Sequence, residues 1–282
     1  MEISLGEVES ATVAGAGVQS ADVASGSAST RVANTGITGS GLAEDALTDE
    51  RFANPFWWAL ETEQRRFAVG DGAGQRLARR YPAEVIPFGA LKDASAEALR
   101  ALRDLLEPDE TIYVNSSEPL DAIAEVEGLV CVKALPCWQM HFPAAAAVPA
   151  RRDAGLICQL DADDAAAMVK LTDVAFPGFF RPRGYEPGPF YGIHVDGELV
   201  AMAGERVAVP GFREISAVCT HPAYTGRGYG AMLVEHVVRA HRAVGLKSFL
   251  HVLEKNVRAV GLYERLGFCT TRRIPVYQLQ RL

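Results

Sequence analysis

The chain has 282 residues, of which 49% are hydrophobic and 22% charged, and its formal net charge is −7. This length suits one large domain or two ordinary domains of roughly 100–200 residues each, and the composition is typical of a water-soluble globular protein. The acidic balance and the lack of a Lys/Arg block exclude a nucleic-acid-binding protein, and the lack of a run of ~20 apolar residues excludes a membrane-spanning one.

The first residues and the cysteines indicate a cellular compartment. The chain begins Met1-Glu2, without the basic region and Leu-rich core of a secretory signal. Its cysteines are odd in number and include no C-x-x-C pair, so we expect neither a disulfide framework nor a zinc site. The six histidines are scattered, and we expect no metal. These features predict a cytoplasmic protein with reduced thiols.

The N-terminal half divides by composition. Residues 1–47 are rich in Ala, Ser, Gly, Val and Thr and hold few bulky side chains, so they offset little of the entropy of ordering. We predict a disordered low-complexity tail there. Residues 48–145 hold an aromatic cluster, a helix that Asp93 or Ser95 begins, and three strand-like runs, which predict a smaller α/β domain. The Ala- and Pro-rich residues 146–154 follow as a predicted linker.

The C-terminal part, 155–282, has a clear succession of elements. Asp196-Gly197 and Pro210-Gly211 are hairpin-turn signals between apolar runs. In chain order we expect a strand at 155–160, a helix from 161, strands at 190–195, 199–209 and 213–220, a helix at 228–243, a strand at 247–253, a helix from 256, and a last strand at 268–280. The expected fold class is α/β (α+β), with a mixed, mostly antiparallel sheet and flanking helices.

A glycine-rich loop joins the strand 213–220 to the next helix. It reads Thr225-Gly226-Arg227-Gly228-Tyr229-Gly230-Ala231. Glycines lack Cβ atoms, so their backbone approaches a ligand closely, and the helix start adds unpaired N–H groups and a positive dipole end. Arg227 adds a full charge. The loop therefore predicts a binding site for an anion such as a pyrophosphate.

The C-terminal half resembles the GNAT N-acetyltransferase superfamily. Gly228 and Gly230 meet the family's pyrophosphate signature, Gln/Arg-x-x-Gly-x-Gly/Ala, although Thr225 stands where Gln or Arg is usual. Asn256 and the run 262–268 match the family's second signature. More loosely, 48–145 is similar to the N-terminal half of two-part members such as glycine N-acyltransferase, where that half is a degenerate copy of the same fold.

The resemblance implies a function and a site. Acetyl-CoA would be the co-substrate, and the acceptor would be an amine of a small molecule or peptide; the sequence leaves the acyl chain length and the oligomeric state open. Tyr263 matches the tyrosine that protonates the departing thiolate, and Glu214 matches a general base. The residues implied to bind the cofactor are Ala217, Val218, Cys219, Thr220, Thr225, Gly226, Arg227, Gly228, Tyr229, Gly230, Ala231, Asn256 and Tyr263.

Other interpretations stay open at this point. Tyr263 lies on the apolar stripe of its helix and also suits a packed core, and Asn256 is equally an N-cap. Glu205, His194 and His221 compete with Glu214 for the role of base, and His221 also suits a turn before Pro222.

Two other functions compete with acetyl transfer. A CoA-binding regulatory module without catalysis is the first alternative. An NAD(P)-binding oxidoreductase is the second, because Gly226-x-Gly228-x-x-Ala231 fits a dinucleotide fingerprint with Glu254 as its acidic residue.

Overall fold

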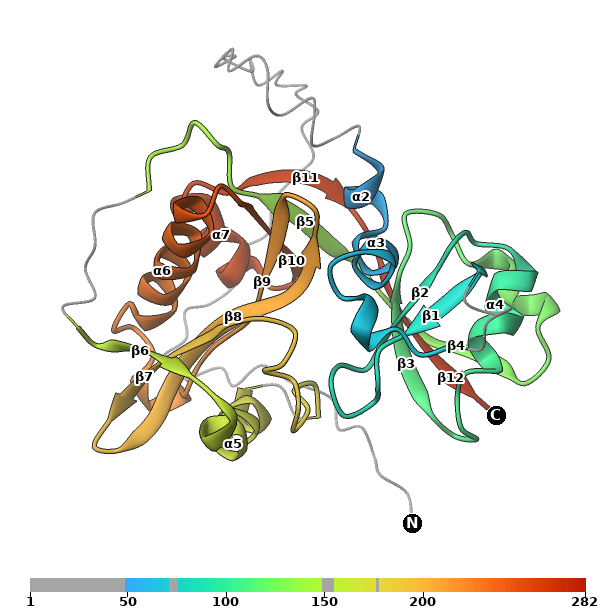
Figure 1. Ribbon diagram of the computed structural model, residues 1–282, viewed down its shortest axis with the longest axis horizontal. Helices are drawn as coiled ribbons and strands as arrows, with labels where there is room; N and C mark the ends of the chain where they lie inside the picture. Colours follow the sequence, from blue (N-terminus) through green and yellow to red (C-terminus); the bar gives the residue numbers. More distant parts are fainter. Residues whose placement is uncertain (1–48, 71–75, 149–154, 176–177) are drawn as a thin grey trace, which may run out of the picture. The chain divides into compact units, whose positions relative to one another are not determined.

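Two β-sheets form the frame of the protein, as the computed structural model in Figure 1 shows. The structure describes residues 49–70, 76–148, 155–175 and 178–282, and all of them belong to one contact unit, Gly39–Leu282. The predicted tail 1–47 and residues 149–154 of the predicted linker lie outside the described residues. No helix in the described part of the chain is long and apolar enough to cross a membrane.

The larger sheet has seven strands in the order β11-β5-β10-β9-β8-β7-β6. Its only parallel pair among the described strands is β9–β10. The mostly antiparallel sheet confirms the predicted fold class and differs from the doubly wound parallel sheet that a dinucleotide-binding enzyme requires. The strands are β5 (Cys137–His141), β6 (Ile157–Leu160), β7 (Phe190–Val195), β8 (Glu198–Val209), β9 (Phe212–Thr220), β10 (Lys247–Leu253) and β11 (Cys269–Arg273).

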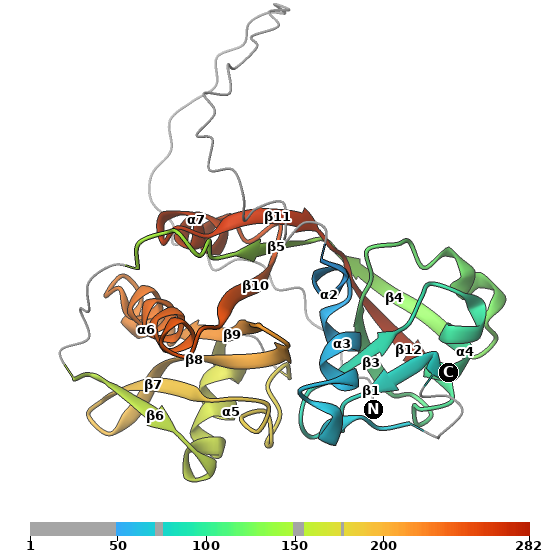
Figure 2. The same ribbon diagram turned by 45° about the horizontal axis from the view of Figure 1, so that its top comes forward.

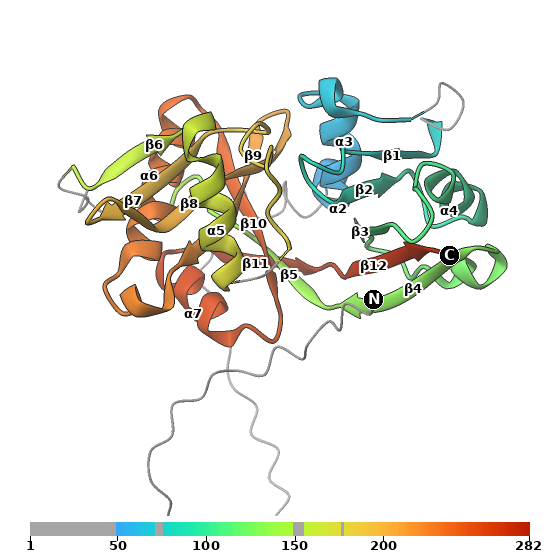
Figure 3. The same ribbon diagram turned by 90° about the horizontal axis from the view of Figure 1, so that it is seen from below.

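Helices cover both faces of this sheet, because successive side chains of a strand point to opposite faces. On β7, Ile193 packs with α6 (Tyr229–Ala243) and α7 (Val257–Arg265), whereas Phe190 packs with α5 (Ala165–Ala175). Figure 3 shows α5 on one side of the strands and α6 on the other. The three predicted helices therefore supply the two halves of the core around the sheet.

The smaller sheet has five strands in the order β1-β2-β3-β12-β4. One face packs against α4 (Ala96–Arg103), whose Leu99 and Leu102 contact the cluster that contains Ile112. Of the two predicted caps, Ser95 is the one that accepts from the helix backbone. The strands are β1 (Ala78–Arg80), β2 (Phe88–Leu91), β3 (Thr111–Asn115), β4 (Leu129–Leu135) and β12 (Val276–Arg281).

The two sheets exchange strands across the predicted domain boundary. β5 precedes the predicted linker but pairs with β10 and β11 in the larger sheet. β12 ends the chain but pairs with β3 and β4 in the smaller one. The strand expected at 268–280 is broken between β11 and β12, where Pro275 cannot donate to a ladder. In Figure 2, β11 and β12 pass from one sheet to the other.

The predicted aromatic cluster fills a core between the sheets. Phe52 of α2 (Glu50–Ala53) and Phe56 of α3 (Pro55–Glu61) pack with Phe88 of the smaller sheet and with Phe249 of the larger one. The rings of Phe56 and Phe88 stack at 4.6 Å. Trp57 and Trp58 are half-buried and pack against this core.

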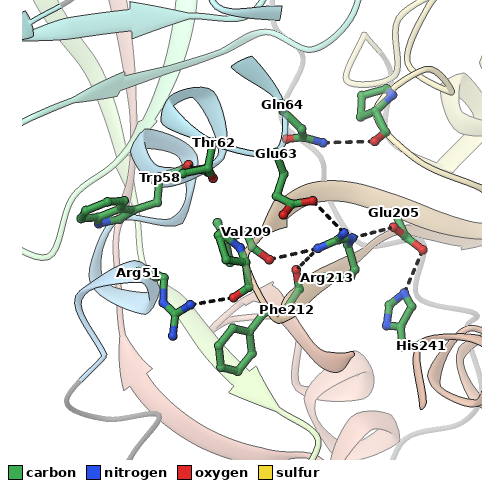
Figure 4. A network of polar contacts seen from close by, with 12 residues as sticks. Arg51, Trp58, Thr62, Glu63, Gln64, Glu205, Val209, Phe212, Arg213 and His241 are labelled. Atoms are coloured by element: carbon green, nitrogen blue, oxygen red, sulfur yellow. Dashed lines mark hydrogen bonds and ion pairs between the residues drawn. The ribbon is translucent and has the colours of Figure 1, made fainter. Parts of the chain in front are cut away.

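Hydrogen bonds attach the same helices to the β8–β9 hairpin, as Figure 4 shows. Arg51 donates to the carbonyl of Pro210 at 2.8 Å. Arg213 of β9 pairs with Glu63 at 3.1 Å and with Glu205 at 3.7 Å. Gln64 donates to the carbonyls of Pro187 and Arg206. The segment 49–64 is thus fixed to the strands that lead into the candidate site.

Candidate functional site

A separation of two parallel strands opens the larger sheet. The β9–β10 ladder contains only three residue pairs and ends at Phe249↔Glu214, whereas the strands themselves run on to Thr220 and Leu253. Beyond that pair, the edge of β9 that faces β10 has no partner in β10. Its N–H and C=O groups are therefore available to an extended ligand that enters between the strands.

A β-bulge in β9 lies where the strands separate. Ala217 has φ +51, and the register against β8 shifts between the pairs Gly204↔Ser216 and Met202↔Cys219. A bulge bends its strand and increases the local twist. A non-glycine residue at positive φ is uncommon and costs of order 1–3 kcal/mol, so surrounding contacts must hold this bend. The predicted cofactor residues Ala217, Val218, Cys219 and Thr220 all lie in the bent part.

The glycine loop forms an exposed cradle directly before α6. Gly226 and Gly228 both have φ +80, and nothing lies within 4 Å of the position that a Cβ would take in either. Gly228 is the N-cap of α6 and provides no side chain to satisfy the first N–H groups. An exposed helix start with unpaired donors attracts an anion through both hydrogen bonds and its dipole.

The loop and the bent strand adjoin. A Cβ added to Gly230 would lie 3.8 Å from Thr220 Oγ1 and 3.9 Å from Val218 Cγ1. Tyr229 and Ala231 pack in the same cluster as Val218. The structure therefore brings the two predicted cofactor segments together, with the anion cradle at one end of the strand opening.

The remaining loop side chains have distinct contacts. Thr225 donates through Oγ1 to the carbonyl of Pro222 at 3.0 Å, which fixes the preceding turn η5 (Pro222–Tyr224). The Arg227 guanidinium lies 4.7 Å from the centre of the Tyr224 ring. Arg227 is exposed and has no ion pair within 4 Å among the described residues, so its charge remains available to an anion.

Asn256 and Tyr263 lie on α7. Asn256 accepts from the Ala259 N–H at 3.1 Å and caps the helix. Tyr263 is 8% exposed. Its ring packs against Phe268, with 5.8 Å between ring centres, in the cluster that also contains Val218. Burial raises the pKa of Tyr263, so its hydroxyl carries a proton at neutral pH. The packing role is thus observed, and it leaves a protonated phenol on the side of the sheet that bears the cradle.

Glu214 lies inside a buried polar network. It is fully buried, accepts two hydrogen bonds from Arg206 at 2.6 and 3.0 Å, and lies 2.8 Å from His251 Nδ1. Burial acts to raise its pKa, but the charges and hydrogen bonds of Arg206 and His251 outweigh burial and lower the pKa to about 2. Such a carboxylate is a weak base, and these contacts favour a structural role over the predicted one of proton acceptor.

The network extends to a fourth strand, β5. His251 Nε2 lies 3.1 Å from Gln139 Nε2, and Gln139 also donates to the carbonyl of Phe52 at 2.8 Å. Arg206, His251 and Gln139 escaped the sequence analysis, because each belongs to a different strand and no spacing along the chain relates them. Strand pairing brings them together: Gln139 lies opposite His251 on β5 and β10, and Glu214 pairs with Phe249, two residues before His251.

The competing candidates for a base have other partners. Glu205 Oε1 lies 3.0 Å from His241 Nε2 in a buried contact. His221 accepts from the Ala223 N–H and caps η5, which confirms its predicted place in a turn. His194 lies against Cys158 and Asp164. Cys219 is buried, and burial raises the pKa of its thiol to about 12, as suits a core residue.

The described residues hold no group of three or more His, Cys, Asp or Glu side chains placed to bind a metal ion. The strand opening instead offers backbone N–H and C=O groups, glycines, and the guanidinium of Arg227, which has no ion pair among the described residues. These groups fit a phosphate-bearing ligand with an extended arm better than they fit a cation.

Comparisons with known proteins bear on this site. The family model described as Acetyltransferase (GNAT) family matches residues 160–268, which include the bent strand, the glycine loop and Tyr263. The structure of a GNAT-family protein from Novosphingobium aromaticivorans is 31% identical and has a TM-score of 0.73, and the alignment covers 83% of this chain and 100% of that one.

Two further relatives are more distant or cover less. Mycothiol acetyltransferase from Streptomyces avermitilis is 33% identical over 98 residues, which are 34% of this chain and 32% of that protein. The chain thus aligns with about a third of that relative's length. The structure of a GCN5-related N-acetyltransferase-like protein from Streptococcus suis is 16% identical and has a TM-score of 0.55. The alignment covers 86% of this chain and 99% of that one. This last likeness concerns the fold alone.

Proposed function

The chain belongs to the GNAT acetyltransferase family, and on this basis we propose that it transfers an acetyl or short acyl group from acetyl-CoA directly to the amine of a small molecule or peptide. The observation that carries the proposal is the opening between β9 and β10 beyond Phe249↔Glu214, with the glycine loop at its end. An extended thioester with a pyrophosphate at one end matches both features.

The residues that would hold acetyl-CoA are the two segments that adjoin. The N–H groups of the loop and of the start of α6 would bind the pyrophosphate, with Arg227 as a charged donor. The unpaired edge of β9 from Val218 to Thr220 would bind the pantetheine arm through backbone hydrogen bonds. Acetyl-CoA itself supplies an activated acetyl thioester.

The chain's own groups would then stabilise the transfer. Backbone N–H groups near Val218–Thr220 would donate to the carbonyl oxygen as negative charge develops there. Tyr263 would donate its proton to the departing thiolate as the C–S bond breaks, and its raised pKa means that the phenol carries that proton when the thioester binds.

Glu214 would act through other residues in this scheme. Its oxygens are occupied by Arg206 and His251, so the proton of the attacking amine would leave through a water chain. Glu214 would fix β8, β9 and β10 to one another at the point where the opening begins.

The loop 178–189 offers a contact for the acceptor. The Phe179 ring lies 5.2 Å from Tyr113 and 5.9 Å from Phe88, and the Arg206 guanidinium lies 4.7 Å from Phe88. A chain of ring contacts thus joins this loop to the Glu214 network. Arg181 follows on the same loop, and its buried Nε has no hydrogen-bond partner. Its guanidinium would pair with a carboxylate on the acceptor.

Calorimetry with acetyl-CoA is the first test. We expect saturable binding in the micromolar range typical of enzyme substrates, and a lack of binding at millimolar acetyl-CoA would refute the proposal. The second test is a panel of amines, with and without a carboxylate, in which release of free CoA thiol is measured.

A catalytically inactive CoA-binding module is the second candidate. Thr225, at the position where the family usually has Gln or Arg, and the occupied oxygens of Glu214 favour it. This candidate predicts acetyl-CoA binding without thiol release across the whole panel. The two tests together distinguish it from an active transferase.

A further inference from the structure

Three reactive side chains meet at the outer edge of the larger sheet, away from the strand opening. Cys158 lies on the edge strand β6, His194 on β7, and Asp164 in the short helix η4 (Ala162–Asp164). Cys158 Sγ is 3.4 Å from His194 Nδ1, and His194 Nε2 is 3.9 Å from Asp164 Oδ1. A thiol, an imidazole and a carboxylate therefore stand in a row on the surface.

The local structure fixes each member. Cys158 pairs with Gly192 across the strands, so His194, two residues further along β7, faces the same side of the sheet and lies diagonally opposite. Asp164 belongs to a capping box in which its Oδ2 accepts from the Asp161 N–H at 3.0 Å. The other oxygen, Oδ1, is the one turned toward the imidazole.

This order of groups is that of a nucleophile, its base and the group that orients the base. Burial and the charge of Asp164 raise the pKa of Cys158, so the thiol keeps its proton at neutral pH. It becomes nucleophilic only if a neighbour accepts that proton, and His194 Nδ1 is within reach to do so. The Asp164 carboxylate would stabilise the resulting imidazolium.

The other cysteines provide an internal comparison. Cys137 and Cys219 are buried, and burial raises the pKa of each. Cys131 and Cys269 are exposed, but neither thiol hydrogen-bonds an imidazole among the described residues; Cys269 contacts His141 across the strands through its backbone. Among the described residues, Cys158 alone combines exposure with a thiol–imidazole hydrogen bond.

We propose that Cys158 is a site of covalent S-acylation that accepts the acyl group of an acyl thioester such as acetyl-CoA. His194 takes the thiol proton as sulfur attacks the thioester carbonyl, and a new C–S bond forms. The old C–S bond breaks, and the leaving thiolate takes the proton from His194. One thioester and one thiol are consumed and one of each is formed, so no oxidant or further reactant is needed.

This site lies at the β6 edge of the sheet, three strands from β9, and takes the thioester from solution. The proposal therefore stands apart from acetyl transfer to an amine. Loss of acetyl-CoA binding in calorimetry would remove the proposed transferase function and leave the thiol chemistry to be decided by its own measurement.

The test is incubation of the full chain with acetyl-CoA, followed by intact mass and peptide mapping under conditions that preserve thioesters. We expect one added acetyl group on Cys158, with Cys131 and Cys269 labelled far more slowly. His194→Asn and His194→Gln remove the base and should slow labelling of Cys158 about 100-fold, while thermal unfolding checks that each variant is folded. Tyr263→Phe should leave the labelling rate unchanged, because Tyr263 belongs to the other site.

Three results would overturn the proposal. The first is equal labelling of Cys131, Cys158 and Cys269, which would reduce Cys158 to an ordinary exposed thiol. The second is a Cys158 labelling rate that both folded His194 variants leave unchanged. The third is a lack of acetylated Cys158 while the small-molecule thiol cysteine is acetylated under the same conditions.

Discussion

Replacement of Glu214 by Gln tests whether this carboxylate holds the sheet together or takes a proton. Gln keeps the size and polarity of the side chain but removes its charge. Glu214 is fully buried and the Arg206 side chain is 13% exposed, so Glu214→Gln leaves a guanidinium in the interior without its counter-charge. Removal of one partner from a buried pair usually costs about 3–5 kcal/mol of unfolding free energy.

The pKa of Glu214 gives a second way to work out how much this carboxylate contributes to the free energy of unfolding. The pKa falls from 4.5 to about 2 in the folded protein, and each pKa unit corresponds to about 1.4 kcal/mol, so ionisation of Glu214 stabilises the fold by about 3 kcal/mol. Because the folded pKa is the lower one, this stabilisation is complete above pH 4.5 and is lost as the pH falls from there toward 2.

Urea unfolding at neutral pH measures the effect, with Glu63→Gln as the matched control. Glu63 also pairs with an arginine, Arg213, but its side chain is 41% exposed, so its loss should cost below about 1 kcal/mol. We expect a difference of about 2 kcal/mol or more between the variants and a smaller deficit for Glu214→Gln near pH 3. Equal stability of the two variants, or a folded Glu214→Gln with no acetyl transfer and wild-type stability, would refute the structural role.

Three further predictions concern the proposed substrate contacts. Gly228→Ala should cost about 1 kcal/mol of stability, because its φ is +80, and should also weaken acetyl-CoA binding. The control Gly245→Ala, at φ +75 in equally open space, should cost similar stability and leave binding unchanged. Urea unfolding measures the stability and calorimetry the binding. Tyr263→Phe should lower kcat about 100-fold with little change in acetyl-CoA affinity, and unchanged turnover would leave Tyr263 a packing residue only. Arg181→Gln should raise KM for carboxylate-bearing amines at least ~10-fold through loss of a charged hydrogen bond, whereas an equal rise for the matching amines without a carboxylate would contradict a carboxylate contact.

The features that sequence predicted well are those that neighbouring residues determine. The strands β7 and β10 were expected at their observed bounds, and the glycine loop was expected to end at the start of α6. Hydrophobic periodicity, turn residues and glycines act within a few residues of one another. The proposed cofactor site is built from such local pieces, which explains why its segments were found together.

The features that sequence missed depend on pairing between distant segments. Nothing in the run Cys137–His141 specifies that it pairs with β10, more than a hundred residues later. The same holds for Arg206 and His251, which meet Glu214 only after three strands are aligned. The sequence therefore identified Glu214 as a candidate general base, but it did not identify Arg206 and His251, the partners that determine the pKa of Glu214.

The exchanged strand β5 has a consequence for the opening itself. A strand that leaves its neighbour loses ladder hydrogen bonds, and unpaired backbone groups in an interior are costly. β10 leaves β9 after Phe249, yet it pairs with β5 throughout Phe249–Leu253, the segment that β9 no longer supports. β5 thus satisfies one edge of β10 and holds it in place while the other edge faces the opening. Because β5 comes from the N-terminal half, that half contributes directly to the geometry of the proposed acetyl-CoA site.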